Sequence, residues 1–137
     1  VETTEIIVAG TGLVTETDEA LLEISLGDFE GEHEAVLKRR MGDAFDQWRA
    51  LHFTKSAPQG ETLYEAIDRV RPALTALQSL GTRQNVLIVA HQGINMAIMA
   101  ALSGCQDLAS LADFRQRNDQ VEVWDLERGM RIERFDV

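Results

Sequence analysis

An unbroken apolar run that ends in a histidine, Val86 to Ala90 followed by His91-Gln92-Gly93, constrains the fold of this chain most strongly. A short β-branched run of this kind predicts a strand that is buried on both faces, and such strands belong to sheets covered by helices on both sides. The apolar residues from Ile94 to Leu102 predict a helix directly after it. Ligands of open α/β sheets bind beyond the carboxyl ends of the strands, where the next helix offers unpaired N–H groups. The run therefore predicts an anion site at His91, with Gly93 letting the backbone turn.

Length and composition limit the other possibilities. The chain has 137 residues, which we assign to a single domain over 1–137, and its hydrophobic and charged fractions are 45% and 26%. No apolar run approaches the roughly 20 residues that span a bilayer, so we expect no membrane insertion. The net charge of −10 opposes nonspecific binding to nucleic acid. Cys105 is the only cysteine and the N-terminus lacks a secretory signal pattern, so a reducing cytoplasm is the simplest location.

Hydrophobic periodicity and turn residues predict the remaining elements. The segment 62–80 is predicted as an amphipathic helix with Thr62 as its N-cap, Pro72 inside it and Gly81 after it. The segment 32–51 is predicted as two helical pieces or one kinked helix, because Gly42 interrupts it. The other expected elements are helices at 2–9 and 105–114, a short strand at 13–15, and a hairpin of residues 121–126 and 130–135.

Three sequence blocks occur in an order and spacing that resemble the histidine phosphatase superfamily, also called the phosphoglycerate-mutase-like family. They are Leu21-x-Glu23-x-x-x-Gly27-x-x-Glu30-Gly31, Gly60-Glu61-Thr62 at a helix start, and the run that ends in His91. The segment Phe114-Arg115-x-x-Asn118 before the hairpin also resembles the family. The resemblance implies an α/β fold, a three-layer α/β/α sandwich. It further implies transfer of a phosphoryl group to a histidine in an Arg-His-Gly motif.

This chain contains no Arg-His-Gly motif. Its first residues resemble the helix just past the family's second phosphate-binding arginine, so the strands that carry the nucleophile are expected to precede Val1. Without those strands the run 86–90 would have bare edges, and each buried unpaired backbone group costs roughly 1–3 kcal/mol. We therefore expect this chain to be the C-terminal part of a longer enzyme and to be inactive as written. An intact mass that matches the 137 residues would require another explanation.

The resemblance assigns roles to a few residues of this chain. His91 resembles the family's second histidine, which binds the phosphoryl group and stabilises charge in the transition state. Glu23 resembles the acid/base that protonates the leaving group and later activates water. Gln92 is expected to donate its main-chain N–H to phosphate, with the role of its side chain left open. Arg39 and Arg40 lie in a segment where family members vary their substrate contacts, so we keep them as a candidate recognition patch.

Each of these residues also has an ordinary structural interpretation. A histidine at a strand end is more often a hydrogen-bonded structural residue, and an isolated glutamate or arginine is more often solvated surface. The position of His91 before a helix, and of Glu23 within its block, favour the functional interpretation. No residue spacing predicts a metal site or a nucleotide-binding loop, so no metal or other cofactor is expected.

The expected function is hydrolysis of a small phosphorylated substrate. A phosphoglycerate mutase of the same family is the alternative within enzymes, because mutases return the phosphoryl group to the substrate and the sequence does not separate the two. A non-catalytic member of the fold that binds a phosphorylated ligand or a partner is the alternative from another class. Assembly into a homo-oligomer is left open.

Overall fold

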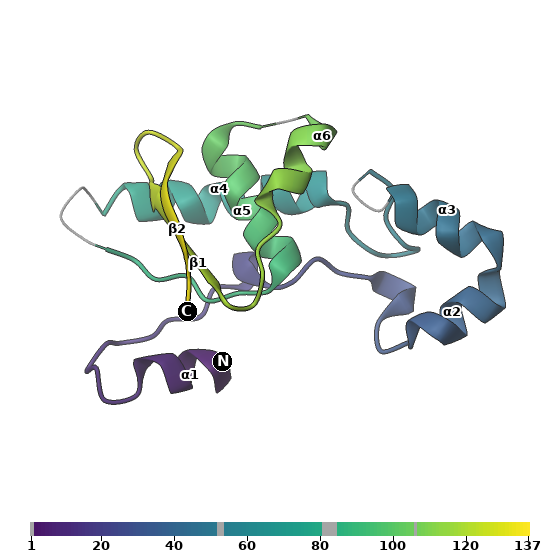
Figure 1. Cartoon of the computed structure of the whole chain (residues 1–137), viewed down its shortest axis with the longest axis horizontal. Coiled ribbons are helices and arrows are strands. Elements are labelled where there is room, and N and C mark those ends of the chain that lie inside the picture. Colours follow the sequence, from purple (N-terminus) through teal and green to yellow (C-terminus); the bar gives the residue numbers. More distant parts are fainter. Residues whose placement is uncertain (1, 52–53, 81–84, 106) are drawn as a thin grey trace.

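The computed structural model describes residues 2–51, 54–80, 85–105 and 107–137. Helices dominate these residues, and a single β-hairpin closes the chain (Figure 1). The described elements, with 3-10 helices written η, are α1 (Glu2–Val8), η1 (Glu19–Leu21), η2 (Gly27–Phe29), α2 (Glu34–Met41), α3 (Asp43–Leu51), α4 (Leu63–Gln78), α5 (Gln92–Ser103), α6 (Leu108–Leu111), η3 (Ala112–Phe114), β1 (Gln120–Asp125) and β2 (Met130–Asp136).

The packing of α4 against α5 forms the main core. Helix α4 begins with a reciprocal capping box: the Thr62 hydroxyl accepts from the Glu65 N–H at 3.2 Å, and the Glu65 carboxylate accepts from the Thr62 N–H at 2.8 Å. Its apolar stripe at three- and four-residue steps is buried against α5. Ala66, Ala97 and Ala100 are each 0% exposed, so small side chains let the two helices approach closely. This core fixes the position of the N-terminus of α5.

The turn of the hairpin lies against the end of α5. Strands β1 and β2 are antiparallel, with Gln120 opposite Asp136 and a register shift between Val123 and Trp124. Gly129 in the turn has φ +61°, and a Cβ there would lie 2.0 Å from the carbonyl oxygen of Leu102 at the end of α5. The turn can therefore pack against α5 only because residue 129 is glycine.

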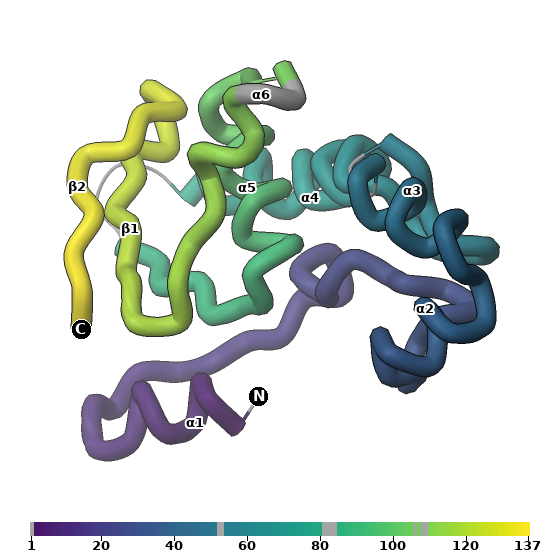
Figure 2. Tube along the Cα trace, turned by 45° about the vertical axis from the view of Figure 1, so that its right-hand side comes forward, coloured from purple at the N-terminus to yellow at the C-terminus, as the bar shows by residue number. Residues whose placement is uncertain are grey.

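Helices α2 and α3 form a second, smaller cluster that lies to one side of the α4–α5 core in both views (Figures 1 and 2). Phe29, Leu37, Phe45 and Ala57 are its buried residues, and the Phe29 and Trp48 rings meet edge to face with centroids 5.1 Å apart. Gly42 has φ +58° between the two helices. The prediction of two helical pieces is therefore confirmed, and Gly42 is the break.

Most of the other predicted elements are also confirmed. Helices are present within 2–9, 62–80, 94–102 and 105–114, and the hairpin is present at the chain end. The last of these helical segments consists of α6 and η3, and Gly81 lies outside the described residues.

The predictions of strands at 86–90 and at 13–15 are wrong for this structure, in which both segments are irregular. A strand needs a neighbour to pair with, and the only sheet among the described residues is the β1–β2 hairpin. Ile88 and Ala90 pack on the main core, whereas the side chains of Val86 and Leu87 remain 44% and 55% exposed. The apolar run is thus covered on one side only.

Candidate active site

The N-terminus of α5 is the centre of the candidate site. His91 is the N-cap residue, with extended backbone angles of φ −85° and ψ 165°, and its side chain does not cap the helix. The imidazole is exposed at this position. The structure therefore places His91 at a helix N-terminus, as the sequence predicted, and leaves its ring available to solvent.

The carboxylate of Glu23 caps this helix in place of the histidine. Its Oε2 accepts from the Gly93 N–H at 3.1 Å and its Oε1 accepts from the Ile94 N–H at 2.8 Å. Oε1 also accepts from the N–H of Ile24 at 2.8 Å. These bonds satisfy N–H groups of the first turn that have no partner within the helix. Glu23 and His91, which are 68 positions apart in sequence, thus meet at one end of α5.

Gly93 allows this contact. A Cβ at position 93 would lie 2.6 Å from the Oε1 atom of Glu23 and 3.2 Å from its Cδ atom. The sequence suggested that Gly93 serves the chain turn before the helix, and the structure adds that the missing side chain makes room for the carboxylate.

This geometry corrects one expectation. The first N–H groups of α5 were predicted to be open to an anion, but Glu23 occupies those of Gly93 and Ile94. Among the described residues, no hydrogen-bond acceptor is recorded for the main-chain N–H of Gln92. Gln92 therefore remains the N–H donor that this helix end can offer to a phosphate oxygen. Glu23 itself is exposed.

The side chain of Gln92 forms a hydrogen bond within the protein. Its Nε2 donates to the carbonyl oxygen of Gln116 at 2.7 Å, while Asn95 Nδ2 donates to the Gln116 Oε1 at 2.9 Å. Gln116 in turn donates to the carbonyl oxygen of Gln120 at the start of β1. This amide network ties the hairpin to the first turn of α5.

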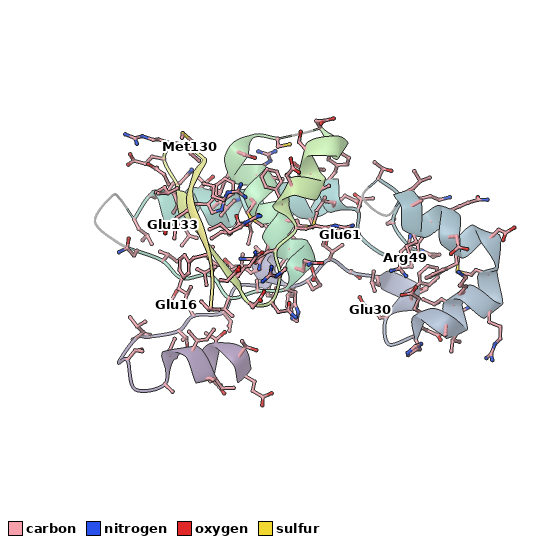
Figure 3. The ribbon with its side chains drawn as sticks, in the orientation of Figure 1. Glu16, Glu30, Arg49, Glu61, Met130 and Glu133 are labelled. Carbon is pink, nitrogen blue, oxygen red and sulfur yellow. The ribbon has the colours of Figure 1, made fainter. Side chains whose placement is uncertain are left out.

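Arg69 lies beside Glu23, and no sequence motif pointed to it. It projects from α4 and forms a bidentate ion pair with Glu61, with both N–O distances 2.8 Å. Figure 3 labels Glu61, which lies next to the start of α4. The hydrogen bonds and charge of Glu61 raise the pKa of Arg69, and the charge of Glu23 adds to the effect. Glu23, Glu61 and Arg69 line a pocket of about 280 Å³. The only sequence signal for Arg69 is an arginine beside the apolar stripe of a helix.

Arg39 and Arg40 are not brought to this site. Both are exposed on α2, in the smaller cluster, and Arg40 donates to Glu32 at 2.8 Å. Arg49 and Glu30, labelled in Figure 3, mark the same part of the molecule. The described residues thus give Glu23, His91 and Gln92 one location, and the two arginines another.

Two kinds of feature are absent from the described residues. Within the described part of the chain, no three His, Cys, Asp or Glu side chains are arranged to hold a metal ion. No helix of those same residues is long and apolar enough to span a membrane.

The helix end that holds Glu23 and His91 thus leaves the Gln92 N–H as a donor for an anion. Residues 1–135 match the histidine phosphatase superfamily (branch 1), and the chain belongs to this family.

Two known proteins are similar to the chain. One is named "Putative phosphoserine phosphatase 2", from Hydrogenobacter thermophilus, and is 38% identical over 95 residues, which are 69% of this chain and 45% of that protein. The other is the native structure of mycobacterial glucosyl-3-phosphoglycerate phosphatase, with 28% identity and a TM-score of 0.68. The match to that structure covers 82% of this chain and 55% of the other. The chain thus spans about half the length of these relatives and shares the fold of the histidine phosphatases.

Proposed function

We propose that this chain forms part of a phosphomonoester hydrolase that acts through a phosphohistidine, and that the attacking histidine comes from residues outside the sequence given. The observation that carries the proposal is the meeting of His91 and the Glu23 carboxylate at the N-terminus of α5. The substrate is a small phosphorylated molecule, as for the two named relatives, both of which are called phosphatases.

The chemistry has two steps. In the first, an imidazole nitrogen of the external histidine attacks phosphorus, the bond to the leaving oxygen breaks, and Glu23 supplies the proton that this oxygen takes up. In the second, water attacks phosphorus, the phosphorus–nitrogen bond to the histidine breaks, Glu23 accepts a proton from the water, and inorganic phosphate leaves. His91 and the Gln92 N–H bind the oxygens of the transferring phosphoryl group and stabilise their charge.

The need for an external segment follows from the charges at the site. A phosphoryl group requires several positive or N–H donors, and the guanidinium of Arg69 beside Glu23 is already paired with Glu61. The sequence contains no Arg-His-Gly motif. In addition, the half-exposed apolar residues Val86 and Leu87 offer a surface that further strands of the fold would cover. The chain by itself is therefore proposed to be inactive.

The test begins with the residues encoded upstream of Val1. If they contain an Arg-His-Gly motif after a strand, the protein that includes them should hydrolyse a general phosphate ester, with inhibition by vanadate. We expect His91→Asn to lower kcat/KM by about 10²-fold or more, the usual loss when a group that stabilises transition-state charge is removed.

His33→Asn is the matched control, because His33 is an exposed N-cap residue of α2 and lies in the other cluster. Its activity should stay within a factor of about 2, as expected for a surface substitution away from the site. Equal activity of the His91→Asn variant and the wild-type protein would refute the role given to His91.

A non-catalytic phosphate-binding member of the same fold is the second candidate. Binding of a phosphate oxygen by the exposed His91 ring and the Gln92 N–H needs no attacking histidine, which is consistent with this candidate. If the upstream residues also lack the motif, the expected result is binding of inorganic phosphate or a phosphate ester without turnover, which isothermal titration calorimetry would detect.

A further inference from the structure

The guanidinium of Arg69 is saturated with hydrogen bonds to two parts of the chain. Its Nε and Nη2 donate to the two carboxylate oxygens of Glu61. Its Nη1 donates to the carbonyl oxygens of Glu19, at 3.3 Å, and Ala20, at 2.8 Å, and its Nη2 donates to that of Leu22 at 3.0 Å. All five N–H groups of the side chain therefore have an acceptor.

The three main-chain acceptors, in Glu19, Ala20 and Leu22, immediately precede Glu23 in the sequence. Helix η1 contains no fully buried residue, and Leu21 and Ile24 are only partly buried against the main core. The three carbonyl oxygens bound by Arg69 add polar contacts that fix the segment to α4. The side chain of Arg69 is 28% exposed and that of Glu61 is 17% exposed, so the pair is shielded from water more than the Arg71–Asp68 pair on the same helix.

Glu61 holds the chain on the other side of Glu23. Its main-chain N–H donates to the carbonyl oxygen of Ser25 at 2.9 Å. The neighbouring Gly60 and Gly27 also meet at close range, since a Cβ at Gly27 would lie 2.3 Å from the Gly60 nitrogen. The Arg69–Glu61 pair is thus hydrogen-bonded to residues both before and after Glu23, and the carboxylate of Glu23 extends to the first turn of α5.

We propose that Arg69, oriented by Glu61, is a positioning residue that holds the Glu23 carboxylate at the N-terminus of α5, and that it contributes to turnover through Glu23 rather than by contact with the phosphoryl group. The inference rests on the proposed function, because it assumes that Glu23 is the proton donor. The guanidinium of Arg69 donates all its N–H groups to Glu61 and to main-chain carbonyl oxygens, which leaves it no donor for a substrate.

Lysine cannot replace this arginine. Its ammonium carries three N–H donors at one point, whereas Arg69 bridges a carboxylate and three carbonyl oxygens through a planar fork. Arg69→Lys keeps the charge but loses the bridge, so it tests positioning apart from charge. Arg71→Lys is the matched control, because Arg71 is on the same helix and forms an exposed pair with Asp68.

The experiment uses the complete protein, with the residues that precede Val1, and two substrates. The leaving group of 4-nitrophenyl phosphate departs without a proton, whereas that of 2-phenylethyl phosphate needs one. We expect Arg69→Lys to lower kcat/KM for the alkyl ester by about 10²-fold, the loss associated with a misplaced general acid, and for the aryl ester by less than about 5-fold. Arg71→Lys should leave both values within a factor of about 2.

A second variant and a second background keep the inference testable if Arg69→Lys folds poorly. Glu61→Gln should likewise lower kcat/KM more for the alkyl ester than for the aryl ester. In a Glu23→Gln background, Arg69→Lys should cause no further loss on the alkyl ester, because residues that act as one unit are not additive.

The outcomes separate this inference from the proposed function. Equal losses on both esters, or full additivity with Glu23→Gln, would show a purely structural Arg69 and overturn the inference alone. A complete wild-type protein that hydrolyses neither ester would overturn the proposed function and, with it, this inference.

Discussion

Gly93→Ala probes directly how α5 and Glu23 fit together. The added Cβ would lie 2.6 Å from the Oε1 atom of Glu23, closer than nonbonded carbon and oxygen atoms approach, and 3.2 Å from the Cδ1 atom of Ile24. The Glu23 oxygen is the far end of a flexible side chain, so it can move aside. In doing so it would lose its hydrogen bonds from the Gly93 and Ile94 N–H groups.

Two opposing effects set the size of the change. Loss of a side-chain cap at a helix N-terminus costs about 1–2 kcal/mol in favourable cases. Replacement of glycine by alanine within a helix gains about 0.5–1 kcal/mol, and residue 93 does not have the positive φ that would strain alanine. The expected net effect in the wild-type background is a destabilisation of about 0.5–1 kcal/mol.

The effect of Gly93→Ala on the free energy of unfolding should change sign when the Glu23 carboxylate is removed. In a Glu23→Ala background no carboxylate competes with the new Cβ, so Gly93→Ala should stabilise the protein by about 0.5–1 kcal/mol. The coupling between the two positions is then about 1–2 kcal/mol. Urea unfolding followed by circular dichroism would measure all four proteins of this cycle. A coupling smaller than about 0.5 kcal/mol would refute the cap that the structure assigns to Glu23.

Two further predictions concern the core helices. Hydrogen bonds from Thr62 lower the pKa of Glu65 below its ordinary value of 4.5, so its contribution to stability is present above that pH and is lost as the pH falls through the lowered pKa. Glu65→Gln should therefore flatten the fall in unfolding free energy as the pH is lowered below about 4.5. Parallel curves for the two proteins would contradict this prediction. Ala97 is 0% exposed between α4 and α5, so Ala97→Leu should overpack the interface and destabilise the protein by about 1–3 kcal/mol. Ala76→Leu, on the exposed face of α4, should change stability by less than about 0.5 kcal/mol in the same urea titration.

The helices were predictable because their signals are local. The capping box at Thr62 and Glu65, and the apolar stripe that follows it, occur within one segment and act over one or two turns. Gly42 similarly marked the break between α2 and α3. The run 86–90 was predicted as a strand from the same kind of local pattern. That prediction failed in this structure because a strand requires a partner, which a local pattern does not specify.

The candidate site was predictable in part. The sequence placed His91 before a helix and selected Glu23 from its block, and the structure brings both to the same helix end. The sequence did not indicate that Glu23 occupies two of the N–H groups expected to be open to an anion. Nor did it indicate the five hydrogen bonds of Arg69, because the acceptors lie up to 50 positions away along the chain.

The sequence by itself determined the α/β class, the start of α4 after Thr62, the break at Gly42, and the family resemblance carried by the blocks around Glu23, Glu61 and His91. Only the tertiary structure decided which groups touch. The packing of α4 on α5 brings Arg69 and Glu61 against the segment of Glu23, and the missing side chain of Gly93 lets the carboxylate reach the helix. The physical reason is the range of the interactions: caps and periodicity act within a few residues, whereas the site is built by contacts between segments that only folding brings together.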